Sequence, residues 1–105
     1  MPSYIVKVDQ DTDLFVEWST VVEAPCFWGS RAAMEAAGYA TDRLDRAEAT
    51  GSSCAGDISG WYTWGEGFIY DQQGWLPRAR LAELTARLGA DRRADCTDLL
   101  DPFED

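Results

Sequence analysis

Residues 4–22 read YIVKVDQDTDLFVEWSTVV, and the fold is inferred outward from them. Two runs rich in β-branched and aromatic residues, 4–8 and 14–22, flank a short Asp-rich segment. Asp favours turns because its side chain bonds nearby backbone N–H groups, so the pattern predicts a β-hairpin. Alternation along the strands places the apolar residues at even positions on one face and Lys7 and Glu17 on the other.

Capping signals and apolar spacing predict two or three helices, because the first two segments can also form one helix kinked at Gly38. Ser30 and Thr41 suit the N-caps of two short helices, the second of which ends before Gly51. Pro77 suits the first turn of a third helix, whose leucines recur at spacings of three and four up to position 88.

A second hairpin is predicted from two aromatic runs, Trp61–Trp64 and Phe68–Tyr70, joined by Gly65, Glu66 and Gly67. The whole chain, 1–105, is therefore predicted to be a single α+β domain. It would contain an antiparallel sheet of about four strands from two β-hairpins, with two or three helices packed mainly on one face. Residues 90–105 form an acidic C-terminal tail, for which partial docking is favoured over disorder because apolar residues interrupt the charges.

The chain is strongly acidic. Nineteen Asp and Glu against nine Lys and Arg give a formal net charge of -10. Direct nucleic-acid binding is disfavoured, because phosphate is bound mainly by Lys and Arg. The charge favours another protein with a basic surface as partner, while the alternative is that acidity serves solubility alone.

Histidine is absent and the three cysteines are widely spaced, which predicts free thiols and neither a metal site nor a cofactor. Catalysis of the Ser-His-Asp or Cys-His kind is excluded, so the chain is predicted not to be an enzyme. Carboxylate-only catalysis stays an alternative. The N-terminus shows no signal sequence and no membrane span, which predicts a cytoplasmic protein without a membrane partner.

Aromatic residues gather in the band 61–75, where strand alternation puts large rings on both faces of the predicted hairpin. Both faces can pack on helices, or one can form a partner surface or a ligand pocket. The candidate binding residues are Trp61, Tyr62, Trp64, Glu66, Tyr70, Trp75, Glu17 and Glu23.

Three segments carry a resemblance: 14–22 (LFVEWSTVV), 42–53 (DRLDRAEATGSS) and 76–81 (LPRARL). They are similar to small uncharacterised proteins of high-GC actinobacteria and their phages. The resemblance covers most of the chain and implies no activity. One Lys against eight Arg fits a GC-rich coding sequence.

Charge, size and missing catalytic groups favour a non-catalytic accessory protein that binds another protein through acidic and aromatic surface. A phage-type inhibitor or a nucleic-acid mimic is one form of this hypothesis. The alternative is a small-ligand-binding protein that uses the aromatic band 61–75 as a pocket, across a homodimer in one version.

Overall fold

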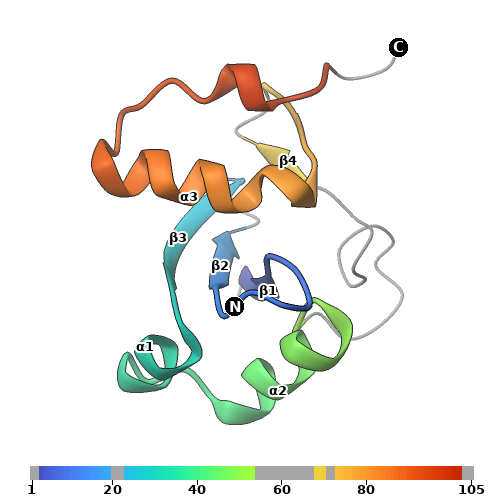
Figure 1. Cartoon of the computed structure of the whole chain (residues 1–105), viewed down its shortest axis with the longest axis vertical. Coiled ribbons are helices and arrows are strands. Elements are labelled where there is room, and N and C mark those ends of the chain that lie inside the picture. The colour runs from blue at the N-terminus through green and yellow to red at the C-terminus, as the bar shows by residue number, and fades with distance from the viewer. Residues whose placement is uncertain (1–2, 20–22, 54–67, 71–72, 103–105) are drawn as a thin grey trace.

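The computed structural model describes residues 3–19, 23–53, 68–70 and 73–102, and the structural statements below concern these residues. They form a single α+β globule (Figure 1). The elements in chain order are β1 (Ser3–Lys7), β2 (Phe15–Ser19), β3 (Ala24–Gly29), α1 (Arg31–Ala36), α2 (Thr41–Thr50), β4 (Phe68–Tyr70), β5 (Gly74–Leu76), the 3-10 helix η1 (Arg78–Arg80), α3 (Leu81–Ala90) and the 3-10 helix η2 (Thr97–Leu99).

The main sheet is an antiparallel meander in the order β1-β2-β3. The N-terminal hairpin is confirmed, with Tyr4 opposite Trp18 and Val6 opposite Val16. The third strand was not predicted, because Pro25 and Gly29 suggested an irregular connection. Proline is tolerated here because β3 is an edge strand of this sheet, where a missing N–H breaks no internal ladder.

The prediction of one sheet of about four strands is not confirmed. The proposed strand 61–64 and the turn at 65–67 lie outside the described residues. Phe68–Tyr70 pairs instead with Gly74–Leu76, as a separate two-stranded sheet. Gln73 N–H donates to the Tyr70 carbonyl at 2.8 Å, and this bond joins the end of β4 to the residue before β5.

Helices cover both faces of the three-stranded sheet, whereas the sequence predicted packing mainly on one (Figure 1). The even-numbered strand residues pack against the leucines of α3. Ile5 and Phe15 point the other way and pack against Met34, Leu44 and Ala47 of α1 and α2. The odd-numbered face also carries Lys7 and Glu17. Because of these polar residues, the sequence pattern did not indicate that Ile5 and Phe15 on the same face are buried.

Two of the predicted helix ends are confirmed. Ser30 Oγ accepts a hydrogen bond from Ala33 N at 3.2 Å, and Gly51 closes α2 in the left-handed conformation. The N-cap of α2 is Ala40 rather than Thr41, and no side chain caps it.

The outer edge of β1 is occupied by the segment that follows α2. Lys7 N–H donates to the Gly51 carbonyl at 3.1 Å, and Ser53 N–H donates to the Ile5 carbonyl at 2.7 Å. The Ser53 hydroxyl also accepts from Ile5 N–H at 2.7 Å. These bonds shield one edge of the main sheet.

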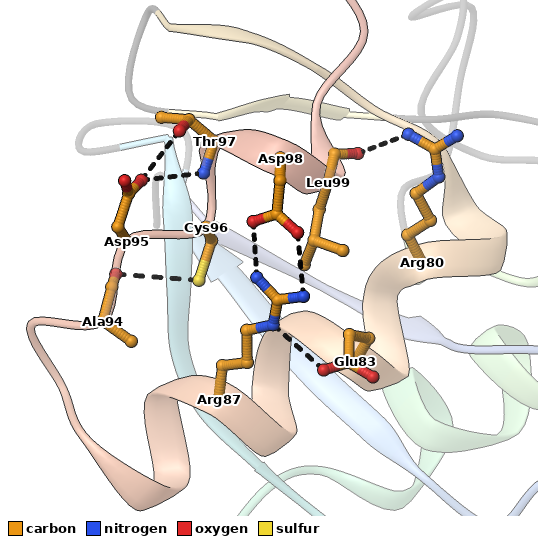
Figure 2. A network of polar contacts seen from close by, with 9 residues as sticks. All are labelled: Arg80, Glu83, Arg87, Ala94, Asp95, Cys96, Thr97, Asp98 and Leu99. Carbon is orange, nitrogen blue, oxygen red and sulfur yellow. Dashed lines mark hydrogen bonds and ion pairs between the residues drawn. The ribbon is translucent and has the colours of Figure 1, made fainter.

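The described part of the acidic tail returns along α3 (Figure 1). Cys96 and Leu99 are buried in the α3 core, and Asp101 exchanges backbone hydrogen bonds with Trp75 at 2.8 and 2.7 Å. Figure 2 shows the side-chain contacts that hold this return: Arg87 binds both carboxylate oxygens of Asp98, at 2.5 and 2.9 Å, and also Glu83.

This ion pair makes stability depend on pH. The Arg87 guanidinium lowers the pKa of Asp98 below its usual value by hydrogen bonding to the carboxylate. A carboxyl whose pKa is lower in the folded state contributes stability above its ordinary pKa, and this contribution is lost as the pH falls through the folded value. We expect Asp98→Asn to reduce the difference in melting temperature between pH 7 and pH 3.

Circular dichroism melts at the two pH values measure this difference. Asp11→Asn is the matched control, because Asp11 is exposed in a turn and has no ion pair with a described residue. An unchanged pH difference in Asp98→Asn would contradict a stabilising role for this pair.

Candidate functional site

The predicted binding residues divide into three groups. Trp61, Tyr62, Trp64 and Glu66 lie outside the described residues. Tyr70 and Trp75 are half-buried: the Tyr70 ring packs 6.3 Å from that of Trp18, and the Trp75 backbone pairs with Asp101.

The two predicted carboxylates are placed differently from each other. Glu23 lies in the turn before β3, in the left-handed conformation with φ 56°. Glu17 lies on β2 and faces an open groove. The groove therefore brings together one predicted residue with others that the sequence did not single out.

This groove lies between the main sheet and the connection from α1 to α2, and its volume is about 630 Å³. Ligand pockets commonly measure about 300–1,000 Å³, so it has the size of a binding site. Its floor and walls are formed by Glu17, Phe27, Ala37, Gly38, Tyr39, Ala40 and Arg43.

Glu17 is held at the sheet side of the groove by two hydroxyl groups. Oε1 accepts a hydrogen bond from Tyr39 Oη at 2.6 Å, and Oε2 accepts one from Ser3 Oγ at 2.9 Å. Within the described residues no Lys or Arg forms an ion pair with this carboxylate. Each carboxylate oxygen retains further acceptor capacity, so the group can receive a donor from outside.

Tyr39 reaches Glu17 because α1 ends in a tight turn. Gly38 adopts φ 96°, which a glycine accepts without strain, and its N–H donates to the Glu35 carbonyl. Tyr39 N–H then donates to the Met34 carbonyl at 3.2 Å, which fixes the backbone beneath the ring. Burial, together with the hydrogen bond to Glu17, raises the pKa of Tyr39 above its usual value, so the phenol stays a proton donor.

Phe27 supplies the apolar wall of the groove. Its ring stacks on that of Tyr39, with centroids 5.8 Å apart and planes 21° apart. At 38% exposure it is the exposed large hydrophobic residue of the part of the chain that the structure describes. Opposite Phe27 in the strand register is Glu17, so ring and carboxylate lie on the same face of the sheet.

The arrangement suits the binding of a cation better than a reaction. An aromatic face and a carboxylate together attract an ammonium or guanidinium group, while the long stem of Lys or Arg can lie along the ring. Arg43 contributes one positive charge from α2 and has no ion pair with a described residue. Among the described residues, no group of three or more His, Cys, Asp or Glu could hold a metal ion.

Sequence reasoning missed Phe27, Tyr39 and Arg43. The available signals were Phe27 in a short apolar run after Pro25, and Tyr39 directly after a helix-ending glycine. Neither signal indicates that the two rings meet, because their contact depends on how α1 crosses the sheet.

Comparison with protein-family models, with curated proteins and with solved structures finds no significant match. In the described ranges no helix is long and apolar enough to cross a membrane.

Proposed function

We propose that this chain is a non-catalytic binding protein whose groove receives a positively charged side chain of a partner protein. One observation carries the proposal: the Glu17 carboxylate is oriented by two hydroxyls, lacks an ion pair among the described residues, and lies beside the exposed Phe27 ring. Because the Glu17 carboxylate is already held in place before binding, less conformational entropy is lost when a partner's cation binds it.

The charge distribution supports a basic partner. Several of the chain's cations are engaged internally: Arg31 with Glu35, Asp45 and Glu48, and Arg87 with Glu83 and Asp98. Lys7 and Arg78 are buried. The remaining surface keeps an excess of negative charge, which accelerates encounter with a basic surface at low salt.

The nucleic-acid-mimic form of the hypothesis has less support than a single cation site. A mimic needs rows of carboxylates that are free to replace phosphates, whereas the acids around Arg31 and Arg87 are paired with those arginines.

A small ligand is the second candidate, because the groove volume also falls in the range of small-molecule pockets. Native mass spectrometry of protein purified from its source distinguishes the two candidates. A retained small molecule favours the second, and an apo chain that binds basic peptides favours the first.

The proposal predicts a selective effect of neutralising Glu17. We expect Glu17→Gln to weaken binding of a fluorescent peptide of alternating lysine and valine by about tenfold or more, since a charge-assisted hydrogen bond contributes roughly 1.5–3 kcal/mol. Glutamine can still bond Tyr39 and Ser3, so the fold is retained. Fluorescence anisotropy at low and high salt measures the affinity.

Two variants complete the test. Asp11→Asn changes the net charge equally but lies in the β1–β2 turn, so it is expected to weaken binding far less. Arg43→Gln removes a positive charge from the groove and is expected to tighten binding. Equal effects of Glu17→Gln and Asp11→Asn would show non-specific attraction and reject the groove. A pull-down from source-cell lysate at the two salts then identifies the natural partner.

A further inference from the structure

The outer edge of β3 is the second notable feature next to the groove. In the described ranges β3 pairs with β2 alone, whereas the corresponding edge of β1 is shielded by Gly51–Ser53. Figure 1 shows β3 passing along the side of the molecule between α3 and α1. An edge strand offers unpaired N–H and C=O groups to an incoming chain.

The form of β3 limits where a chain can pair. Its register against β2 shifts between Glu17 and Trp18, so that Cys26 is left opposite no residue of β2. Phe27, Trp28 and Gly29 continue in regular register. Pro25 has no N–H to donate, so the usable edge extends from the bulge to Gly29.

We propose that the partner contributes an extended segment that pairs with β3 as a fourth strand of the main sheet. A Lys or Arg of that segment crosses the Phe27 ring and binds Glu17. This inference rests on the proposed function and specifies how the same groove is used. Strand addition takes affinity from main-chain hydrogen bonds and specificity from alternate side chains, and a single cation pocket beside an edge strand suits that division.

The spacing of strands makes the contact possible. Neighbouring strands lie about 4.8 Å apart, so the backbone of an added strand lies roughly 10 Å from that of β2. A residue opposite Phe27 on the added strand points to the same face as Glu17, since Phe27 and Glu17 are themselves opposite. Only the long stems of Lys and Arg span this gap while resting on an aromatic ring.

Charge decides between a basic partner and a second copy of this chain. Two copies paired through β3 would bring together two molecules of formal net charge -10 each. Each would also have to supply a Lys or Arg to the other's Glu17, yet β3 itself contains neither residue. The occupant is therefore a segment of a different, basic protein.

The test uses the lysine–valine peptide and two isomers, one N-methylated at every lysine and one at every valine. Alternate N–H groups of a strand point to the same edge, so strand addition predicts that one isomer loses at least tenfold in affinity while the other binds as the parent does. Equal binding by the two isomers, whether weakened or not, would overturn strand addition while the Glu17 result stands. A parent peptide that fails to bind would reject the proposed function itself.

The exposed Cys26 thiol gives a second readout. Saturation with the parent peptide is expected to slow alkylation of Cys26 at least severalfold, measured by peptide mass spectrometry so that each cysteine is read separately. Buried Cys96 serves as the internal reference for unfolding. An unchanged Cys26 rate under saturating peptide would place the peptide elsewhere and overturn the proposal.

Discussion

Replacing Phe15 with alanine is expected to lower the free energy of unfolding by about 3–5 kcal/mol, the usual cost of removing a buried aromatic ring. The side chain is fully buried among Ile5, Met34, Leu44 and Ala47, which makes it the largest member of the core between the sheet and the α1–α2 pair. Domains are stable by only about 5–15 kcal/mol, so this loss is a large part of the total. Urea unfolding followed by circular dichroism measures it.

Phe27→Ala is the matched control, because it removes the same ring from a position on the neighbouring strand that is 38% exposed. We expect it to lower stability by about 1–2 kcal/mol, less than Phe15→Ala, since it loses the stacking contact with Tyr39 and the burial of only part of the ring. Its main effect is expected on peptide binding. Similar stability losses in the two variants would contradict the assignment of one ring to the core and the other to the groove.

The first hairpin and the helices could be predicted because their signals are local. Alternation, an Asp-rich turn, a serine cap and a glycine stop each act within a few residues of the chain. The same local signals did not predict that helices also cover the second face of the sheet. Ile5 and Phe15 alternate with Lys7 and Glu17, and local patterning cannot show that α1 and α2 cover Ile5 and Phe15 while Glu17 lines a groove.

The third strand, β3, was missed by the sequence-based prediction for a different reason. A proline and a glycine within six residues are strong turn signals, and their exception at a sheet edge requires knowing the strand order. Glu17 was a candidate because it is a carboxylate on a predicted strand. Its hydroxyl partners, Tyr39 and Ser3, are 22 and 14 residues away in sequence, so nothing local indicated them.

The burial of Arg78 is a feature that its sequence context does not indicate. An arginine directly after a helix-initiating proline is ordinarily solvated, yet Arg78 is only 7% exposed. Its Nη1 donates to the carbonyls of Lys7 at 2.7 Å and Gly51 at 3.0 Å. One guanidinium thus joins the end of β1, the C-cap of α2 and the start of the α3 layer.

We expect Arg78→Met to lower the free energy of unfolding by about 2–4 kcal/mol, because buried carbonyls lose a charged donor that methionine cannot replace. Arg80→Met is the control from the same 3-10 helix. Arg80 Nη1 also reaches a carbonyl, that of Leu99 at 2.8 Å, but its side chain is exposed, so a loss below about 1 kcal/mol is expected. Urea titrations of the two variants decide the point. If both lost equally little, burial of Arg78 would not stabilise the junction, and the connection between the two helical layers would depend on the sheet core alone.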